Sequence, residues 1–417
     1  MSAYVVTGKN RLYGSVRVHG AKNSVLPILA ATILVRGESV IGDCPTLRDV
    51  EYTKKILRGL GCLVEGGEGK LRVIADGMDS DAIPDSLMRE MRSSVIFLGA
   101  ILARTGRAEM SFPGGCELGP RPIDLHLAAL RELGAEVTET GGKLICAADK
   151  LRGATVNLTF PSVGATENIM LAATAAEGTT RIHNPAREPE IVDLQNFLCA
   201  MGARVRGAGG SVIEIEGGVP LRGTEYNVLP DRIVTATYLA AVAAAGGAVT
   251  VENARPCQLS AVMAVLREAG CEISEREDKI HIVREHGLKS VRPIRTMPYP
   301  GFPTDAQSII MSAMAMAEGT TVFVENIFEN RFRHAGELAR MGADIRVEGK
   351  VAVVSGVTSL HGAQVESTDL RGGAGLVVAA LGAEGQTVVT GLSHIERGYD
   401  GLAAALCSVG SDIKTIN

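Results

Sequence analysis

The hydrophobic and polar positions of the chain repeat as one pattern, six times. Each copy contains a helix that ends in Leu-x-x-x-Gly, followed by a small residue and a strand. The six glycines are Gly61, Gly134, Gly202, Gly270, Gly342 and Gly410. Their successive spacings are 73, 68, 68, 72 and 68 residues. Because glycine adopts the left-handed conformation that ends many helices, we predict that each of these glycines is a helix C-cap.

A second set of glycines runs in phase with the first. Ala-rich helices are predicted to end at Gly37, Gly106, Gly178, Gly247, Gly319 and Gly385. A β-branched strand follows each helix, as at 179–182 and 320–324. After the first glycine, each repeat is predicted to form two strands around a turn, as in 344–347 and 351–353. One repeat therefore contains two helices and about four strands.

The two ends of the chain are predicted to belong together. The sixth repeat stops after one strand, at 411–417, and residues 4–18 resemble 351–366 of the fifth repeat. The N-terminal strands are therefore expected to complete the last repeat. This predicts an α/β fold (α+β in some schemes) with a continuous domain over residues 22–229 and a second domain made of 1–21 plus 230–417. A hinge is expected near residues 20 and 230.

Composition and charge exclude several classes of protein. The 417 residues are 46% hydrophobic but only 4% aromatic, which suits small helices packed on sheets. A net charge of −5 argues against non-specific nucleic-acid binding. The first residues lack the basic and apolar segments of a signal peptide, and the apolar run 238–245 is too short to span a bilayer. We expect a cytoplasmic protein with no nucleic-acid or membrane partner.

The eight cysteines predict neither a disulfide framework nor a metal site, because none forms a CxxC pair or clusters with histidine at ligand spacing. Cys62 and Cys271 stand where other repeats have alanine, so they are expected to be small core residues. Cys146 and Cys199 also fit apolar faces. Cys116 differs because it lies in 111–122, which contains three glycines and three prolines and is therefore a loop. Arg121 can bias the ionisation of this thiol and hold an anion beside it.

Unusual polar residues collect where each repeat enters its first helix. These entrances are 20–24, 91–94, 161–166, 230–232, 302–307 and 369–373. A helix N-terminus presents free N–H groups and a partial positive charge, so entrances that point the same way would form a cleft for phosphates and carboxylates. Ser93, Ser162 and Thr304 are equally well explained as N-caps. The cations Lys22, Arg92 and Arg371 oppose the helix dipole there and favour an anion site.

The sixfold repeat and five motifs resemble the enolpyruvyl transferases over the whole chain. The motifs are Lys22-Asn23, the Pro-Gly-Gly-Cys loop with 121–125, Ser162-Val163-Gly164, Phe302-Pro303-Thr304-Asp305 and His394-Ile395-Glu396-Arg397. The Cys116 loop is similar to that of the members acting on UDP-N-acetylglucosamine and distinguishes the chain from those acting on shikimate 3-phosphate. The family fold implied is two inside-out α/β barrel domains, each with three repeats, that close over the substrates.

The resemblance also implies a reaction. The enolpyruvyl group of phosphoenolpyruvate would pass to the 3′-hydroxyl of UDP-N-acetylglucosamine, with release of phosphate, through a tetrahedral intermediate and without metal or organic cofactor. This is the first committed step of peptidoglycan synthesis. Asp305 is implied as the general base for the hydroxyl, and Cys116 as the general acid at the methylene carbon. In the family this thiol can also add to phosphoenolpyruvate and is alkylated by epoxide antibiotics.

Substrate contacts are implied in the same way. Lys22, Arg121 and Arg397 would bind the phosphate and carboxylate of phosphoenolpyruvate, Asn23 would orient the intermediate, and Arg371 would join when the cleft closes. The residues implied for the nucleotide-sugar are Arg92, Arg121, Pro122, Ile123, Asp124, Leu125, Ser162, Val163, Gly164, Asp305 and Ile327. For Arg92, a salt bridge within the scaffold is the alternative.

Two positions depart from the family pattern, and two other functions stay open. Phe160-Pro161 stands where the family often has a basic residue, which removes one expected nucleotide contact, and Pro120 replaces a small residue. His394 is expected to hydrogen-bond rather than transfer protons. A transferase of the same fold for shikimate 3-phosphate or another alcohol would lack the reactive cysteine. An inactive paralogue that binds a nucleotide-sugar and regulates a partner would not need every chemical position filled, as it is here.

Overall fold

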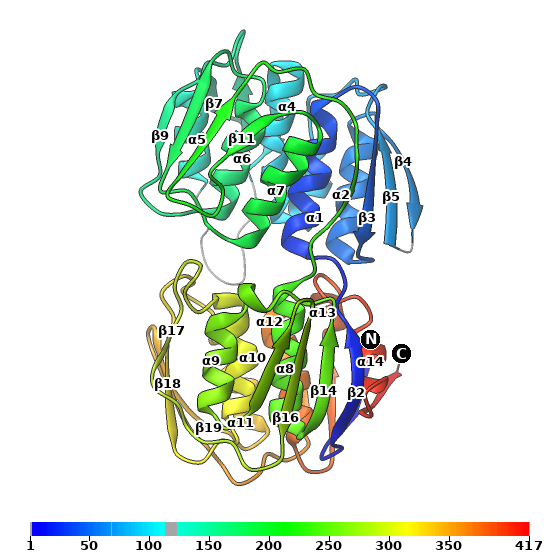
Figure 1. The fold of residues 1–417 in the computed structure, drawn as a ribbon, viewed down its shortest axis with the longest axis vertical. Coiled ribbons are helices and arrows are strands. Elements are labelled where there is room, and N and C mark those ends of the chain that lie inside the picture. The colour runs from blue at the N-terminus through cyan, green and yellow to red at the C-terminus, as the bar shows by residue number, and fades with distance from the viewer. Residues whose placement is uncertain (1, 68, 113–122, 417) are drawn as a thin grey trace. The chain divides into compact units, whose positions relative to one another are not determined.

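The chain forms two compact units in a computed structural model that describes residues 2–67, 69–112 and 123–416 (Figure 1). The terminal unit combines the segment that ends at His19 with the segment that begins at Pro230, and the middle unit runs from Gly20 to Leu229. The two connecting segments run side by side. In the middle unit the Ala21 N–H donates to the Leu229 carbonyl at 2.7 Å, and in the terminal unit the Asp231 N–H donates to the His19 carbonyl at 2.9 Å.

The predicted helix ends are confirmed for the Leu-x-x-x-Gly glycines, which lie just past the C-caps of their helices, but of the second set only Gly106 caps a helix. The glycines of the Leu-x-x-x-Gly motifs have φ values between 91° and 103°, and those of the second set have φ values between 75° and 117°. Side chains other than glycine rarely adopt positive φ values, so glycine ends the helices of the first set at low cost. In the second set the prediction is wrong for Gly37, Gly178, Gly247, Gly319 and Gly385, because the helix ends a few residues earlier and the glycine lies in the turn into the next strand or is its first residue.

The terminal unit contains three four-stranded sheets, with strand orders β21-β22-β1-β23, β15-β16-β14-β2 and β17-β18-β20-β19. Their strands are β1 (Ala3–Thr7), β2 (Leu12–Arg17), β14 (Gly247–Glu252), β15 (Glu272–Arg276), β16 (Lys279–Arg284), β17 (Ile294–Arg295), β18 (Thr320–Val324), β19 (Asp344–Glu348), β20 (Val351–Ser355), β21 (Gln364–Glu366), β22 (Gln386–Thr390) and β23 (Asp412–Ile416).

The described part of the middle unit also has three sheets, ordered β11-β12-β10-β9, β13-β3-β5-β4 and β6-β8-β7. The strands are β3 (Glu38–Cys44), β4 (Leu63–Gly67), β5 (Gly69–Ile74), β6 (Arg107–Ser111), β7 (Glu136–Thr140), β8 (Lys143–Ala147), β9 (Thr155–Asn157), β10 (Thr179–His183), β11 (Arg204–Arg206), β12 (Val212–Glu216) and β13 (Glu225–Asn227). Beside β6, parallel pairing is reduced to a bridge between Ala82 and Glu109.

The N-terminal strands divide between two sheets. β1 pairs antiparallel with both β22 and β23, which confirms that it completes the sixth repeat. β2 pairs in parallel with β14, so the strand that ends the sixth repeat lies in the sheet of the fourth repeat. The reason is a rule of this fold: the last strand of a repeat crosses to the next sheet, as β21 does when it pairs in parallel with β22.

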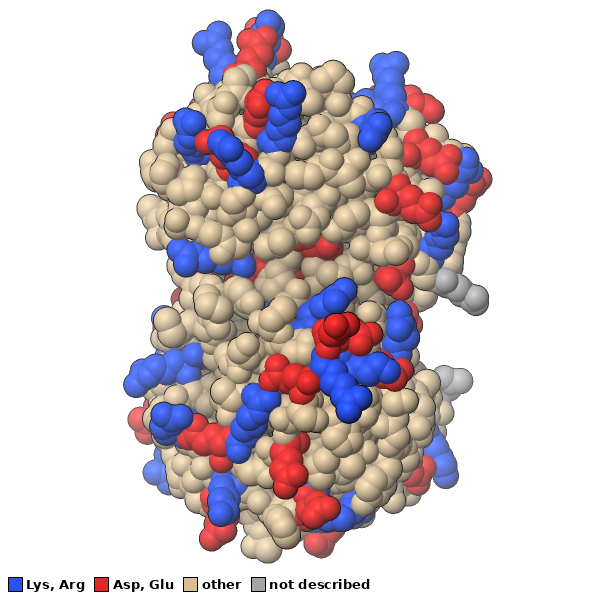
Figure 2. All heavy atoms as spheres, in the orientation of Figure 1, with Lys and Arg blue, Asp and Glu red and all other residues tan. Residues whose placement is uncertain are grey.

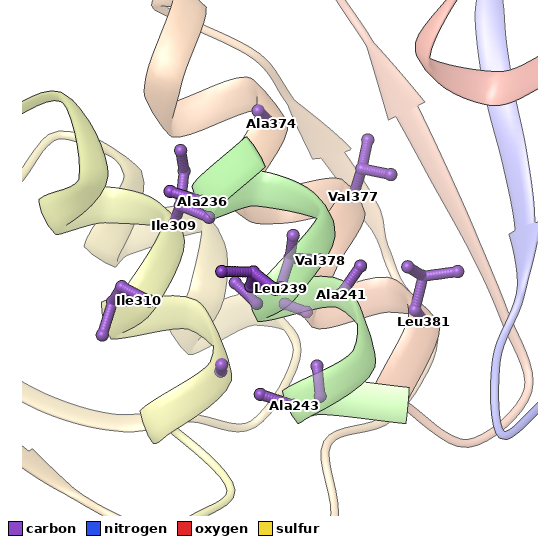
Figure 3. Packing of buried hydrophobic residues seen from close by; sticks show 14 of the residues in the cluster. Ala236, Leu239, Ala241, Ala243, Ile309, Ile310, Ala374, Val377, Val378 and Leu381 are labelled. Carbon is purple, nitrogen blue, oxygen red and sulfur yellow. The ribbon is translucent and has the colours of Figure 1, made fainter. Parts of the chain in front are cut away.

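The centre of the terminal unit is made of helices, and the sheets lie outside them. α8, α10 and α12 pack against one another (Figure 3). In α8 every residue from Arg232 to Ala244 is buried, as expected for a helix that is apolar on all sides. The helices of this unit are α8 (Arg232–Ala245), α9 (Ser260–Glu268), α10 (Thr304–Met314), α11 (His334–Arg340), α12 (Leu370–Gly382), α13 (Leu392–Ile395) and α14 (Leu402–Cys407), with a 3-10 turn η3 (Pro256–Gln258).

The middle unit repeats this arrangement around α4, which contacts both α1 and α6. Its helices are α1 (Lys22–Ala31), α2 (Arg48–Gly59), α3 (Asp85–Glu90), α4 (Phe97–Thr105), α5 (Asp124–Glu132), α6 (Val163–Ala173) and α7 (Pro189–Ala200), with 3-10 turns η1 (Thr32–Leu34) and η2 (Arg92–Ile96). Among the described residues, no helix is both long enough and apolar enough to cross a membrane.

On the outside, acidic and basic side chains alternate over the face shown in Figure 2. Many of them are paired across neighbouring strands, as Arg72 is with Glu38 and Glu65 at 2.7 and 2.8 Å. Exposed pairs of this kind contribute little to stability. The buried ion pairs, in contrast, lie at the starts of α1 and α10.

Candidate active site

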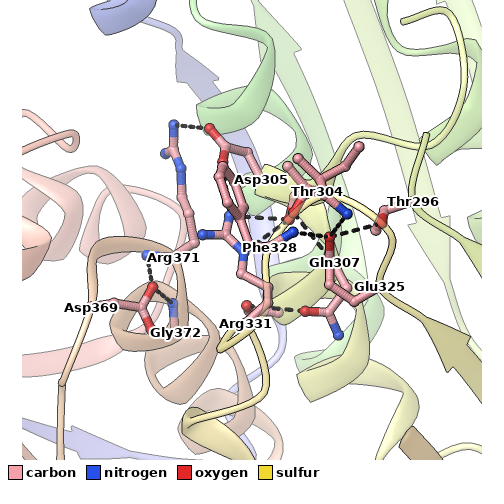
Figure 4. Close-up of polar contacts among 12 residues, drawn as sticks. Thr296, Thr304, Asp305, Gln307, Glu325, Phe328, Arg331, Asp369, Arg371 and Gly372 are labelled. Carbon is pink, nitrogen blue, oxygen red and sulfur yellow. Dashed lines mark hydrogen bonds and ion pairs between the residues drawn. The ribbon is translucent and has the colours of Figure 1, made fainter. Parts of the chain in front are cut away.

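The carboxylate of Asp305 lies between two buried arginines at the start of α10 (Figure 4). Arg331 Nη2 donates to Oδ1 at 2.8 Å, and Arg371 Nη2 donates to Oδ2 at 3.3 Å. Both arginine side chains are 2% exposed, whereas that of Asp305 is 27% exposed. Two guanidinium groups favour the ionised form of the carboxylate, and its partial exposure leaves it open to a ligand.

Arg331 holds the backbone next to Asp305 as well as its side chain. Its Nε and Nη2 donate to the Thr304 carbonyl at 3.2 and 3.0 Å, and its guanidinium lies 5.5 Å from the centre of the Phe328 ring. One planar group therefore fixes both the peptide and the carboxylate. Arg331 was not predicted as a site residue, because nothing in the local sequence indicates that an arginine in the loop after β18 is buried.

Arg371 reaches Asp305 from the first turn of α12. Asp369 is the N-cap of this helix and accepts from the N–H groups of Arg371 and Gly372, both at 3.0 Å. The Arg371 guanidinium also lies 5.4 Å from the centre of the Tyr399 ring, whose hydroxyl is 2.9 Å from that of Thr237. A cation at this helix start was predicted to mark an anion site, and the anion that it contacts here is Asp305 itself.

Ser162 and Thr304, both explained as N-caps from the sequence, have different roles in the structure. Ser162 is an N-cap, since its Oγ accepts from the Ala165 N–H at 3.4 Å. Thr304 is not, because it is the first residue of α10 and its hydroxyl donates instead to Glu325 Oε2 at 3.0 Å. Glu325 also accepts from the backbone N–H of Ile327, one of the predicted nucleotide contacts.

In the middle unit, Lys22 is the first residue of α1 and pairs with a buried acid. Its Nζ lies 2.7 Å from Asp49 Oδ2, and the Asp49 side chain is 1% exposed. Asn23 follows and is half-buried. Asp49 was not predicted as a site residue, because it lies in the first turn of α2 and there resembles any acidic residue near a helix N-terminus.

A buried histidine brings two predicted nucleotide segments together. His126 lies in α5 with Asp124 and Leu125, just after Ile123, while Gly164 lies in the first turn of α6 with Val163. A Cβ added to Gly164 would be 3.0 Å from His126 Cε1, so the glycine permits this close approach. Burial lowers the pKa of His126 to about 4, which keeps the imidazole neutral near pH 7.

Asn168 fixes that histidine from α6. Its Nδ2 lies 2.8 Å from His126 Nδ1 and donates to the Val95 carbonyl at 2.9 Å, while its Oδ1 accepts from the Gly99 N–H at 2.6 Å. One amide thus ties α6 to α5, to η2 and to α4. Neither His126 nor Asn168 was singled out from the sequence, because their burial depends on contacts between helices that are far apart in the chain.

The other predicted residues are placed as follows. Arg397 follows α13 and is half-buried, and its N–H donates to the His394 carbonyl at 3.4 Å. Phe160 is exposed. Cys116, Arg121 and Pro122 lie outside the described residues, and so does the side chain of Arg92, whose backbone belongs to η2.

Among the described cysteines, Cys62, Cys146 and Cys271 are buried as expected. Burial raises the pKa of each of these thiols to about 11, so they are unreactive near pH 7. The expectation that Cys199 fits an apolar face is wrong: it is exposed on α7, where its thiol donates to the Val205 carbonyl at 3.3 Å. Within the described ranges, no cluster of three or more His, Cys, Asp or Glu side chains is placed to hold a metal ion.

In this chain, sheets enclose the central helices, and a carboxylate lies between two buried arginines. Sequence comparison identifies the protein family to which the chain belongs. Residues 6–406 match the family described as EPSP synthase (3-phosphoshikimate 1-carboxyvinyltransferase), and the chain belongs to this family. The predicted resemblance to the enolpyruvyl transferases and the predicted fold class are thereby confirmed.

Within this family, individual relatives show which enzymes the chain resembles in sequence. The chain is 53% identical to UDP-N-acetylglucosamine 1-carboxyvinyltransferase 2 of Caldanaerobacter subterraneus subsp. tengcongensis, covering 100% of both chains. It is 51% identical to UDP-N-acetylglucosamine 1-carboxyvinyltransferase 1 of Symbiobacterium thermophilum, covering 99% of this chain and 95% of the relative. Among solved structures, the enolpyruvyl transferase NikO from Streptomyces tendae is similar with a TM-score of 0.89, 25% identity and coverage of 99% and 98%. An EPSP synthase from Acinetobacter baumannii shares the fold with a TM-score of 0.76 at 22% identity, each chain being fully covered.

Proposed function

We propose that this chain is a UDP-N-acetylglucosamine 1-carboxyvinyltransferase. It transfers the enolpyruvyl group of phosphoenolpyruvate to the 3′-hydroxyl of UDP-N-acetylglucosamine and releases phosphate, the first committed step of peptidoglycan synthesis, in the cytoplasm. The observation that carries this conclusion is the identity of 53% and 51% to two enzymes of that name over nearly the full length of each chain. Similarity to the EPSP synthase structure is much lower, at 22% identity.

The proposed chemistry is an addition followed by an elimination. The 3′-oxygen forms a bond to C2 of phosphoenolpyruvate and gives its proton to Asp305, while C3 takes a proton from the thiol of Cys116. Transfer of a proton from C3 to the Cys116 thiolate then restores the double bond as the bond between C2 and the phosphate oxygen breaks, and the phosphate leaves with the proton that Asp305 had taken. The ionised state of Asp305, supported by Arg331 and Arg371, suits a group that must accept a proton.

The remaining residues are proposed to bind the charged substrates. Lys22, Arg121 and Arg397 would neutralise phosphoenolpyruvate, and Asn23 would orient the tetrahedral intermediate. The nucleotide-sugar would contact the segment 121–125, the start of α6 at 162–164, Arg92 and Ile327. The close approach of Gly164 to His126 supports the assignment of 162–164 to the nucleotide-sugar, because it places the start of α6 next to the start of α5, where 121–125 ends.

Phosphate release tests the proposal directly. The protein is mixed with phosphoenolpyruvate and UDP-N-acetylglucosamine, and then with phosphoenolpyruvate and shikimate 3-phosphate. Release with the first acceptor alone is expected. Release only with shikimate 3-phosphate would support the other transferase, and no release with either would support an inactive paralogue.

Variants then test the two proton-transfer groups. Cys116→Ala and Asp305→Asn should each lower kcat by about 10²–10⁴-fold, the usual contribution of a general acid or base. Cys116→Asp should keep partial activity, because a carboxyl group can also deliver a proton. Cys199→Ala is the matched control, since that thiol is exposed on α7 and should be dispensable.

Closure of the chain over its substrates is a further part of the proposal. The division into residues 22–229 and 1–21 plus 230–417, with a hinge near 20 and 230, predicts that UDP-N-acetylglucosamine lowers the radius of gyration in small-angle scattering. An unchanged radius at saturating nucleotide-sugar would contradict closure.

A further inference from the structure

The carboxylate of Glu325 receives four hydrogen bonds in the interior of the terminal unit, where the residue is 1% exposed. Its Oε1 accepts from the Thr296 hydroxyl at 2.9 Å and from the N–H groups of Ile327 and Phe328 at 2.8 and 3.0 Å. Its Oε2 accepts from the Thr304 hydroxyl at 3.0 Å. Figure 4 shows these contacts beside the arginines that hold Asp305. Hydrogen bonds to a charged acceptor are about twice as strong as neutral ones, so the group is a firm local anchor.

The four contacts join two segments that the proposed reaction needs. Thr304 immediately precedes Asp305, and its carbonyl also accepts from Arg331. Ile327 and Phe328 begin the loop that carries Arg331, and Arg331 in turn donates to Asp305. Glu325 therefore holds both ends of one ring of contacts: the peptide before the carboxylate, and the loop that delivers one of its two guanidinium groups.

Comparison among the repeats shows whether the fold itself requires the contacts of Glu325. The residues six positions after the second-set glycines are Asp43, Phe112, Asn184, Asn253, Glu325 and Gly391. Four of them, Asp43, Asn184, Asn253 and Gly391, adopt positive φ values between 51° and 72°. The side chains of Asn184 and Asn253 tie the end of the strand to a neighbouring segment, donating to the carbonyls of Leu158 and Val18, both at 2.8 Å.

In the fifth repeat the next residue makes this tie. Asn326 Nδ2 donates to the Thr296 carbonyl at 3.1 Å, the equivalent of the bonds made by Asn184 and Asn253. Glu325 is thus not required for the tie that the fold uses elsewhere. Glu325 does not make the tie that asparagine makes at this position in other repeats, and this difference occurs in the repeat that contains Asp305.

We propose that Glu325 is a positioning residue for the acceptor side of the reaction. It fixes the Thr304–Asp305 peptide and the loop from Ile327 to Arg331 so that Asp305 faces the 3′-hydroxyl of the nucleotide-sugar. This role rests on the proposed function, since it gives Asp305 the role of base and Ile327 that of a nucleotide contact. It predicts that loss of Glu325 impairs use of UDP-N-acetylglucosamine and spares the binding of phosphoenolpyruvate.

The test uses two substitutions at Glu325 and one at its partner. Glu325→Ala removes all four contacts. Glu325→Gln keeps the shape, and the Thr304 hydroxyl can turn to accept from the new amide. Thr304→Val cuts only the link to the peptide before Asp305 and preserves side-chain volume. Asn253→Gly is the control, because it removes an interior tie of the same kind at a position where glycine accepts the positive φ.

Steady-state phosphate release should distinguish these variants. Glu325→Ala and Thr304→Val are expected to lower kcat by about 10–100-fold and to raise KM for UDP-N-acetylglucosamine, with KM for phosphoenolpyruvate changed less than about twofold. Glu325→Gln should stay within about threefold of wild type. Asn253→Gly should lower the melting temperature without changing either KM. Equal effects on both substrates, or full activity of Thr304→Val, would overturn the proposal.

Amide hydrogen exchange provides a readout that does not depend on turnover. In Glu325→Ala, and not in Asn253→Gly, the amides of Ile327 and Phe328 should lose protection while the amides of β18 keep it. Unchanged protection in Glu325→Ala would refute the anchor itself. If the wild-type protein releases no phosphate from either pair of substrates, the proposed function fails, and the exchange result still decides whether Glu325 holds the loop.

Discussion

Arg331 offers the sharpest test of how the site holds its carboxylate. Arg331→Met keeps most of the buried volume but removes the two bonds to the Thr304 carbonyl, at 3.2 and 3.0 Å, and the bond to Asp305 at 2.8 Å. Asp305 then retains only the longer contact with Arg371 among its two arginine contacts, at 3.3 Å. The carboxylate should rotate away from the orientation that it has here.

The magnitude follows from the burial of each partner. Breaking a fully buried ion pair costs about 3–5 kcal/mol, because one charge stays buried without its partner. Asp305 is 27% exposed, so water can replace part of the lost contact. Methionine also removes the cost of burying the guanidinium. We therefore expect the free energy of unfolding to fall by about 2–3 kcal/mol, of which the Thr304 carbonyl accounts for about 1 kcal/mol.

The assay combines urea unfolding with phosphate release, and the rates are normalised to the folded fraction. Arg331→Met should lower kcat by about 10–100-fold per folded molecule. Arg331→Lys is the matched variant: it keeps the charge, but its compact ammonium cannot replace the planar fork that serves both acceptors, so an intermediate loss is expected. If Arg331→Met keeps the wild-type kcat while losing stability, Arg331 supports the fold alone and the reasoning fails.

Three further predictions concern the middle unit. Gly164→Ala places a Cβ 3.0 Å from His126 Cε1 and should raise KM for UDP-N-acetylglucosamine by about tenfold with little change in KM for phosphoenolpyruvate; unchanged constants would contradict the placement of the nucleotide there. Asp49→Asn removes the buried partner of Lys22 and should lower the free energy of unfolding by about 2–4 kcal/mol and raise KM for phosphoenolpyruvate, whereas a rise confined to the nucleotide-sugar would argue against the role of Lys22. The pKa of His126 is about 4 in the folded chain and 6.5 ordinarily, so only the unfolded chain takes up a proton between these values. The resulting stability is complete above pH 6.5 and is lost as the pH falls toward 4, by up to about 3 kcal/mol. His126→Gln should therefore flatten the pH dependence of chemical unfolding in that window, and equal slopes would refute the assignment.

The candidate site was predictable where its residues share a short motif. Asp305 stood at a predicted helix entrance, and Arg371 was singled out because a cation opposes the helix dipole there. The structure adds that these two residues contact each other. Arg331, Glu325 and Asp49 were not found, because each acts through burial beside a segment that is distant in the sequence. From the sequence alone, an arginine in a loop and an acid after a strand are expected to lie at the surface. Only the tertiary structure shows that they are buried.

Local patterns in the sequence were enough to predict the repeat, the ends of the helices that carry Leu-x-x-x-Gly, and most of the strands. These depend on local rules: a glycine that accepts positive φ, and an apolar periodicity that distinguishes helix from strand. Tertiary structure alone decided that β2 joins β14, that Cys199 faces outward, and that Arg331 and Arg371 hold Asp305. Each of these outcomes is a choice among partners far apart in the chain. Such choices are settled by which polar groups can be satisfied once the central helices are enclosed, and no local pattern records that result.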